Sequence, residues 1–317
     1  MQTFFKLAAA VAVGAVALSG AARAEYPEKP ITMVIPLGAG GSHDLNARVI
    51  TSTIPQYLGQ AMIVRLTPGA GGQKGTQEVA NAAADGYTVL FTHNYIDMLQ
   101  QHVENLPYEP MGDFVPVARV NYAPTAVVVR ADSPYQSFEE LIAAAKDNPG
   151  SVSFAHSGNW GAFFVPAAQI MKATDTAFNL VPYQGGGPAM QALLSGDADA
   201  TMGFPSTLSE LVDSGKVRVL ATAGNERIYD DVPTLAEVGV AGDVGFMHRV
   251  VLVPKGTPEE AIQKLEEAFL ALQEDRTYSQ MMKRLGENVD LLSGGEYQSM
   301  REGQSEAYKA LVDSITQ

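Results

Sequence analysis

Apolar positions follow two periods along the chain, and these predict strands and helices in alternation. Short apolar runs such as TMVIPL and AMIVRL are typical of buried strands. The segments after them, over residues 44–58 and 75–83, carry apolar residues three or four positions apart, as on one face of a helix. A third strand follows at YTVLFTH. This order is typical of an α/β fold with a mostly parallel sheet.

Two long β-rich runs interrupt this rhythm. One covers residues 115–131, and the other returns at residues 246–253. Further short strands lie between them, and helices are predicted over 137–146, 162–174 and 187–194. Ser137 is the expected N-cap of the first of these helices. Two more helices are predicted near the end of the chain, over 258–274 and 297–315.

The long runs indicate a chain that crosses twice between two lobes. We expect lobe 1 to contain residues 25–122 and 250–317, and lobe 2 to contain residues 123–249 as an insertion. A cleft between two lobes is a common place for a ligand.

The first 24 residues predict a secretory signal peptide. An apolar run follows Lys6, and Ala22-Arg23-Ala24 matches a cleavage site before Glu25. The alternative, a membrane anchor, needs about 20 apolar residues, and this run is shorter. The chain has no cysteine, which excludes disulfides and a lipid-modified cysteine. We therefore expect a freely diffusing periplasmic protein.

The net charge of the chain limits which kinds of partner it can bind. The formal net charge is -14, and removing Lys6 and Arg23 with the signal peptide makes it -16. Such a surface repels nucleic acid and anionic membranes, so we expect neither nucleic-acid binding nor membrane insertion. The net negative charge does not exclude a small anionic ligand, because a binding site with local positive potential can outweigh the negative potential of the whole surface. We expect a monomer.

Four glycine-rich segments follow predicted strands, at residues 38–41, 69–72, 157–159 and 185–187. Glycine lets backbone N–H groups approach a ligand, and a helix N-terminus adds partial positive charge, so each turn can bind an anion. For any single loop, glycine is equally explained by an ordinary turn or cap. The first loop lacks the Gly-Lys-Ser/Thr of a P-loop and the spacing of a dinucleotide site. A carboxylate is therefore the better candidate.

Catalytic and metal sites are weakly supported. Ser42, His43 and Asp44 are adjacent, and adjacent side chains diverge instead of forming a triad. The histidines lack metal-ligand spacing. Asp44 is expected to cap its helix. We expect no cofactor, no metal and no enzymatic activity.

His248 and Arg249 are unusual inside the apolar run FMHRVVLV. Because strand residues alternate between faces, one of the two should face the cleft. Arg249 can form a bidentate clamp on a carboxylate, or a salt bridge between the lobes. Trp160 is a candidate wall of the ligand site, whereas Phe163 and Phe164 are more typical of the core. Tyr95 and Phe204 are weaker candidates for such a wall.

The mature chain also resembles a known family along nearly its whole length. EYPEKPITMVIPLGAGGSHDLNAR and LGQAMIVRLTPGAGGQKGTQEVANAAADGYTVLF are similar to the first two signatures of the tripartite tricarboxylate transporter solute-binding proteins, the Bug family. The pattern continues in VPYQGGGPAMQALLSGDADATM and GKVRVLATAGNERIYDDVPTLAEVG. The resemblance implies a two-lobed periplasmic binding protein of type II-like topology. It also implies a carboxylate ligand held largely by backbone amides, and a two-component membrane permease as partner.

The candidate ligand-binding residues combine the family's loops with the unusual side chains. They are Gly38, Ala39, Gly40, Gly41, Ser42, His43, Thr92, His93, Asn94, Ser157, Gly158, Asn159, Trp160, Tyr183, Gly186, Gly187, Pro188, Phe204, His248 and Arg249.

The chain departs from the family pattern where Gly-Ala-Gly-Gly and His43 replace the usual Pro-Pro-Gly-Gly loop, and at residues 246–249. We expect capture of a small di- or aromatic carboxylate by lobe closure, with His248 and Arg249 holding a second acidic group. Two alternatives stay open: a ligand-binding partner of a sensor kinase, and an exported hydrolase using Ser42 or Ser157.

Overall fold

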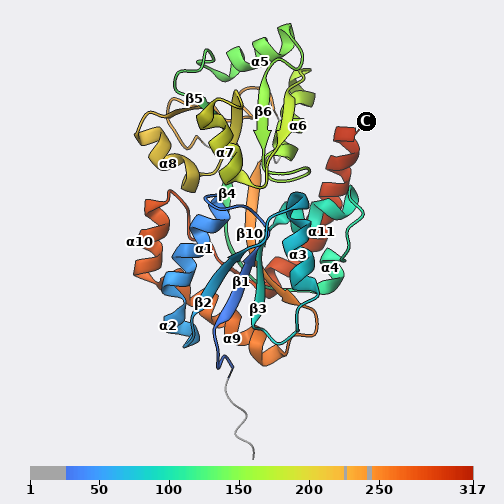
Figure 1. The fold of residues 1–317 in the computed structure, drawn as a ribbon, viewed down its shortest axis with the longest axis vertical. Helices are drawn as coiled ribbons and strands as arrows, with labels where there is room; N and C mark the ends of the chain where they lie inside the picture. The colour runs from blue at the N-terminus through green and yellow to red at the C-terminus, as the bar shows by residue number, and fades with distance from the viewer. Residues whose placement is uncertain (1–25, 225–226, 241–244, 317) are drawn as a thin grey trace, which may run out of the picture.

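The computed structural model describes residues 26–224, 227–240 and 245–316. The predicted signal peptide, residues 1–24, lies outside this part of the chain. Two α/β lobes stand one above the other, and two β segments run between them (Figure 1).

Lobe 1 is built on a six-stranded mixed sheet in the order β11-β4-β10-β3-β1-β2. β1 pairs in parallel with β2 and β3, as the strand-helix alternation predicts, while β10 runs antiparallel to β3 and β4. Apolar side chains on both faces of this sheet are covered by helices, which is why its strands contain near-continuous apolar runs. The strands are β1 (Ile31–Ile35), β2 (Met62–Leu66), β3 (Thr88–His93), β4 (Phe114–Pro124), β10 (Phe246–Pro254) and β11 (Leu292–Ser293).

The helices of lobe 1 come from both ends of the chain. They are α1 (Ser42–Thr53), α2 (Pro55–Leu58), α3 (Gln73–Ala80), α4 (Pro110–Asp113), α9 (Glu259–Leu270), α10 (Arg276–Arg284) and α11 (Gly294–Thr316). Short 3-10 turns cover Ala70–Gly72, Gln100–His102 and Ala271–Glu274, and a π-helical turn covers Tyr95–Leu99.

Lobe 2 has a five-stranded sheet in the order β7-β6-β8-β5-β9. Its strands are β5 (Ala126–Arg130), β6 (Ser153–His156), β7 (Asn179–Pro182), β8 (Ala200–Gly203) and β9 (Val217–Thr222). Its helices are α5 (Phe138–Asp147), α6 (Phe164–Thr174), α7 (Gly186–Ser195) and α8 (Pro205–Asp213). Ser137 caps α5 as predicted, because its Oγ accepts a hydrogen bond from Glu140 N.

The chain passes between the sheets at two neighbouring points. β4 ends at Pro124 and β5 begins in the other sheet at Ala126, so the long predicted run divides at Thr125. Thr125 N donates to Gly245 O (2.8 Å), just before β10 enters the sheet of lobe 1. We expected the boundaries between the lobes to follow residues 122 and 249. In the structure, the first change of sheet occurs after Pro124, and the second occurs before Phe246. The residues on both sides of Thr125 favour β structure equally, so the sequence does not show where the chain leaves one sheet for the other.

One local prediction needs correction, and two helices were not predicted. Asp44 lies in the first turn of α1, whose N-cap is Gly41, and the Asp44 carboxylate accepts from Gly40 N (2.9 Å) in the preceding loop. Helix α8 was not predicted, although Pro205 at its start is a helix signal. Helix α10 was also missed, although Asp275 caps it through Tyr278 N (2.9 Å).

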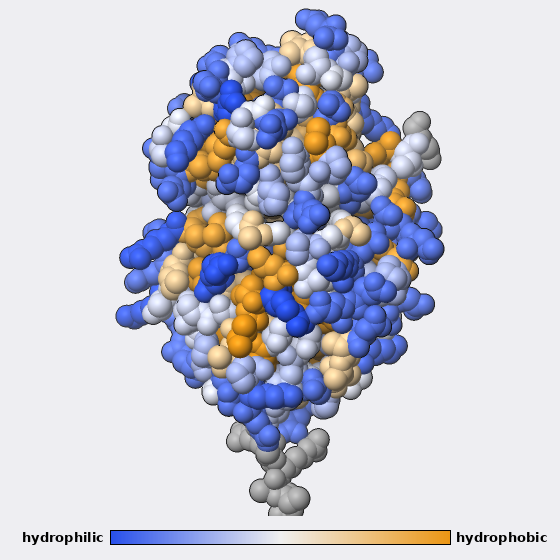
Figure 2. All heavy atoms as spheres, in the orientation of Figure 1, coloured by the Kyte–Doolittle hydropathy of each residue, from blue (hydrophilic) through white to orange (hydrophobic). Residues whose placement is uncertain are grey.

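The surface seen in Figure 2 is largely hydrophilic on both lobes, with apolar side chains gathered on the lower one. Ile63 of the edge strand β2 is 54% exposed. Arg65 follows on the same strand and pairs with Glu78. A charged residue of this kind discourages edge-to-edge pairing of sheets.

Candidate ligand-binding site

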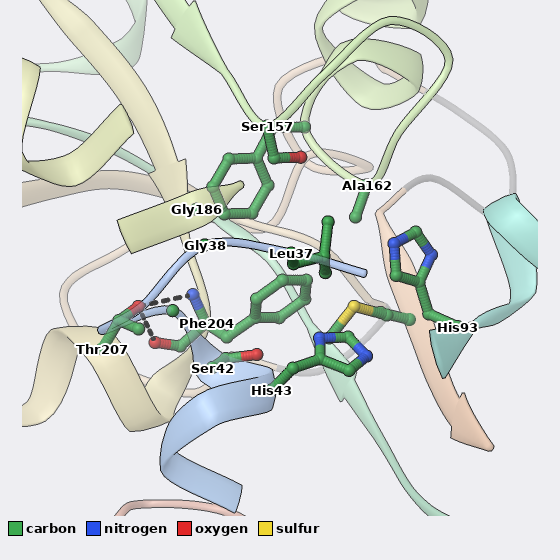
Figure 3. Close-up of a pocket in the computed structure, with 13 residues that line it drawn as sticks. Leu37, Gly38, Ser42, His43, His93, Ser157, Ala162, Gly186, Phe204 and Thr207 are labelled. Carbon is green, nitrogen blue, oxygen red and sulfur yellow. Dashed lines mark hydrogen bonds between the residues drawn. The ribbon is translucent and has the colours of Figure 1, made fainter. Parts of the chain in front are cut away.

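A pocket lies where the two lobes meet. Its empty volume is about 370 Å³, a figure that includes the open solvent at its mouth. Ser157 from lobe 2 lies above this space, Ser42 and His43 from lobe 1 lie below it, and His93 stands beside it (Figure 3). The lining residues are Leu37, Gly38, Gly41, Ser42, His43, His93, Ser157, Ala162, Phe163, Gly186, Phe204, Thr207 and Met247.

Three helices begin at this pocket. Ser42 is the first residue of α1, Gly186 the first of α7, and Phe204 the N-cap of α8. The Thr207 hydroxyl accepts from Phe204 N (3.2 Å), which closes the first turn of α8 (Figure 3). Helix N-termini carry partial positive charge, so their convergence favours an anion, although Phe204 N and Ser206 N of α8 are already paired, with Thr207 and Glu287.

The first and fourth glycine segments contact each other across the lobes. Gly38 N donates to Gln184 O (2.8 Å). A Cβ on Gly187 would lie 2.2 Å from Ala39 O, and one on Gly38 would lie 2.6 Å from Gln184 O. Glycine is therefore required here because two backbones meet without space for a side chain.

The second and third glycine segments form a similar contact. A Cβ on Gly158 would lie 3.1 Å from Gly71 Cα, and one on Gly71 would lie 3.3 Å from Asn159 O. The four predicted segments thus meet in two pairs, one from each lobe in each pair. These contacts bring the lobes together around the pocket.

Arg249 is a structural residue behind the pocket, not an open carboxylate clamp. Its Nη1 and Nη2 each bind one oxygen of Glu287 (2.9 Å each), and both side chains are fully buried. Nη1 also donates to Asn121 Oδ1 (2.8 Å), and Nη2 donates to Ser42 Oγ (2.7 Å). Arg249 is already paired with Glu287, so it acts on the pocket indirectly: it holds Ser42, packs on the ring of Phe204 (5.3 Å to the centroid) and disfavours protonation of the nearby histidines. The hypothesis that it binds a second acidic group of the ligand is therefore corrected.

Glu287 also contacts lobe 2. Its Oε1 lies 3.3 Å from the backbone N–H of Ser206, in the first turn of α8. The carboxylate thus neutralises Arg249 in lobe 1 and meets the positive end of a lobe 2 helix. This gives the closed arrangement a polar contact outside the glycine loops.

His248 faces away from the pocket, as strand alternation requires once Arg249 faces inward. Its ring stacks on Tyr122 (centroids 5.8 Å apart), and Nδ1 lies 3.5 Å from Arg119 Nη1. Arg119 is paired with Asp290 (2.7 Å). Burial and the charge of Arg119 lower the pKa of His248 to about 4. Because His248 faces away from the pocket, the hypothesis that it binds the distal acidic group of a ligand is wrong.

Several other expected residues support the pocket without lining it. Asn94 is buried and binds Phe246 O and Tyr308 Oη, and it accepts from His248 N, so it joins β10 to α11. Trp160 is half-buried with φ 53° and packs on Phe164 (centroids 5.1 Å apart) instead of walling the ligand space. The remaining expected residues outside the lining are Ala39, Gly40, Thr92, Gly158, Asn159, Tyr183, Gly187 and Pro188.

Five lining residues were not among the candidates: Leu37, Ala162, Phe163, Thr207 and Met247. Phe163 was assigned to the core, yet it lines the pocket and packs on Phe204 (centroids 5.4 Å apart). Met247 could have been found from strand alternation, since it shares a face of β10 with Arg249. Thr207 belongs to the unpredicted helix α8.

No charged side chain lines this pocket, and its two imidazoles are held neutral. Burial, followed by the charge of Arg249, lowers the pKa of His93 to about 3. Burial, with His93 and Arg249, places the pKa of His43 well below its ordinary value. Backbone dipoles and neutral groups are therefore what the pocket offers to an anion.

Within the described residues, we find neither a serine–histidine pair suited to hydrolysis nor a group of side chains placed to hold a metal. Ser42 accepts from Arg249, and neither Ser42 nor Ser157 is hydrogen-bonded to a histidine there. In the same part of the chain, no group of three or more His, Asp or Glu residues is placed to hold a metal. Among the described helices, none combines the length and apolarity needed to cross a bilayer.

Two α/β lobes that close on a pocket with converging helix N-termini define a two-lobed solute-binding protein. Residues 46–316 match the family described as "Tripartite tricarboxylate transporter family receptor". The chain belongs to this family of periplasmic solute-binding receptors.

Relatives and solved structures agree with this assignment. The chain is 35% identical to Protein BugT of Bordetella pertussis over 241 residues, covering 75% of this chain and 74% of that protein. It is 30% identical to the periplasmic binding protein BugD, with a TM-score of 0.87 and coverage of 92% and 99%. MatC from Rhodopseudomonas palustris, solved with bound malate, is 26% identical, with a TM-score of 0.84 and coverage of 90% and 100%. Another R. palustris protein, solved with adipate, is 25% identical, with a TM-score of 0.86 and coverage of 92% and 99%.

Proposed function

We propose that this protein captures a small carboxylate in the periplasm by closure of its two lobes. The observation that carries the proposal is the pocket between the lobes, at which α1, α7 and α8 all begin. Their N-terminal dipoles and the amides of the glycine loops stabilise an anion there without a cationic side chain. The malate and adipate named for the two R. palustris proteins are dicarboxylates, and they support a carboxylate ligand here without specifying the number of acidic groups.

Among carboxylates, the lining favours one acidic group attached to an apolar or aromatic body. Phe163, Phe204, Met247 and Leu37 supply apolar surface, and no charged side chain lines the pocket to pair with a second carboxylate. This replaces the expectation of a dicarboxylate, which drew on the family resemblance and on His248 and Arg249, two side chains that do not line the pocket.

We further propose delivery of the ligand to a two-component membrane permease after export through a cleaved signal peptide. The family assignment supports this partner. A transport assay in cells that express the permease with and without this protein tests it. Uptake that is independent of the protein would exclude the permease role, and the sensor-kinase alternative would then be tested by pull-down.

A thermal-shift screen of the mature, refolded protein tests the binding itself. The panel contains mono-, di- and tricarboxylic acids, both aliphatic and aromatic, with sugars, cations and phosphate as controls. A ligand at one hundred times its Kd adds about 2.7 kcal/mol to the free energy of unfolding, which gives a clear shift. A shift confined to carboxylic acids is expected. No shift with any acid, or an equal shift with phosphate, would overturn the proposal.

A further inference from the structure

Two histidines on the lobe 1 side of the pocket are not used by a purely backbone anion site. His43 comes from the first turn of α1, and His93 from the end of β3. Their ring centroids lie 5.3 Å apart, and the side chains face the same space (Figure 3). The two residues are 3% and 2% exposed.

The hydrogen-bonding state of His43 follows from its partner. Nε2 lies 3.1 Å from the carbonyl oxygen of Thr92. A carbonyl only accepts, so Nε2 carries the hydrogen and Nδ1 is left as an acceptor. His43 therefore presents a lone pair, and not an N–H group, at Nδ1.

His93 has an unmet hydrogen bond. Its Nδ1 is buried and has no partner among the described residues. A buried nitrogen without a partner is costly, and turning the imidazole ring would bring this nitrogen to the adjoining pocket, where a ligand group can pair with it. A purely structural role explains the packing of His93 beside Tyr95 (5.9 Å between centroids) but leaves this nitrogen unexplained.

Both rings are neutral, so they do not attract the ligand by charge. Burial and Arg249 depress the pKa of each ring. A neutral imidazole has one donor and one acceptor nitrogen, which suits a hydroxyl group. An ammonium group suits this place poorly, because no carboxylate lines the pocket to pair with it.

We propose that His43 and His93 recognise a hydroxyl group on the carboxylate ligand, so that the protein selects a hydroxylated monocarboxylic acid over its deoxy analogue. The inference rests on the proposed function. The hydroxyl donates its hydrogen to Nδ1 of His43, and its oxygen or the neighbouring carboxylate pairs with the imidazole of His93. The deoxy analogue leaves desolvated ring nitrogens unpaired, which is the condition under which sites discriminate strongly.

Calorimetric titration of the mature chain with matched pairs of acids tests this proposal. The pairs are lactate and propionate, 3-hydroxybutyrate and butyrate, 4-hydroxybenzoate and benzoate, with malate and succinate as the dicarboxylate comparison. In at least one monocarboxylate pair, the hydroxylated acid should bind tenfold or more tightly. Malate should gain nothing over the best hydroxylated monoacid.

Variants connect the preference to the histidines. His43→Phe and His93→Phe keep ring volume and remove the nitrogens, so the hydroxy-to-deoxy affinity ratio should fall toward one. His43→Asn keeps an acceptor near the position of Nδ1 and should retain part of the ratio. His248→Phe removes an imidazole that faces away from the pocket and should leave the ratio unchanged.

The outcomes separate this proposal from the proposed function. If acids bind but deoxy acids bind as tightly as their hydroxylated partners, the hydroxyl assignment is wrong and the carboxylate receptor stands. If no acid binds, both are wrong. Should a variant fail to fold in a thermal melt, the affinity ratio of the unmodified protein still decides the question.

Discussion

The contact between the first and fourth glycine segments predicts that one added methyl group will oppose lobe closure. In Gly187→Ala, the new Cβ would lie 2.2 Å from Ala39 O and 2.8 Å from Gly41 N. Gly187 has no positive φ and lies in the first turn of α7, where alanine strains nothing in lobe 2 itself. The cost therefore falls on the closed arrangement alone.

The expected size of the effect follows from overpacking. Relieving the clash requires the loops to separate by about 1 Å, which weakens the hydrogen bond from Gly38 N to Gln184 O. Overpacking of this kind costs about 1–3 kcal/mol. A penalty of that size on the binding-competent state weakens the apparent affinity by about 5- to 150-fold.

Calorimetry with the tightest acid from the thermal-shift screen measures this loss. Small-angle X-ray scattering should also show a larger radius of gyration for Gly187→Ala than for the unmodified protein. Gly295→Ala is the matched control, since a Cβ there meets nothing within 4 Å. If Gly187→Ala binds the acid within twofold of the unmodified protein, closure through these loops is not part of binding.

Three further predictions concern stability, each measured by urea unfolding. Arg249→Met leaves Glu287 buried without its partner and should cost about 3–5 kcal/mol; a loss below about 1 kcal/mol would indicate a solvated pair. The pKa of His93 is lowered to about 3 in the folded protein, whereas it is about 6.5 in the unfolded chain. As pH falls from 6.5 toward 3, the unfolded chain therefore binds a proton that the folded protein does not, and the free energy of unfolding decreases. The loss should reach about 2 kcal/mol between pH 7 and pH 5, and an unchanged pH dependence in His93→Phe would contradict it. Ser137→Ala removes the cap of α5 and should cost about 1 kcal/mol, whereas no change would mean that the cap is frayed in solution.

The local pattern of the sequence was enough to predict most strands and helices. The turn after β1 illustrates why: an apolar run, then glycines, then a polar helix start leave few conformations open to the backbone. The same reasoning placed Ser137 at the start of α5. It missed α8, although proline at the first helical position is a recognisable start signal.

Side-chain roles were predicted less well, because they depend on partners far along the chain. Arg249 looked like an available cation, yet its charge is neutralised by Glu287, 38 residues later. Trp160 looked like a wall of the site, but a positive φ turns it onto Phe164, while Phe163 takes the position in the lining. No local pattern distinguishes these outcomes.

The sequence by itself determined the α/β class of the fold and the positions of its glycine turns, because periodicity and turn chemistry act over a few residues. Only the tertiary structure decided which turns meet, with Gly38 against Gln184 and Gly71 against Gly158. It also brought His43 and His93 together beside the ligand space, and buried Arg249 against Glu287. These contacts join residues that are distant in sequence, so they are set by the packing of two sheets and the closure of two lobes.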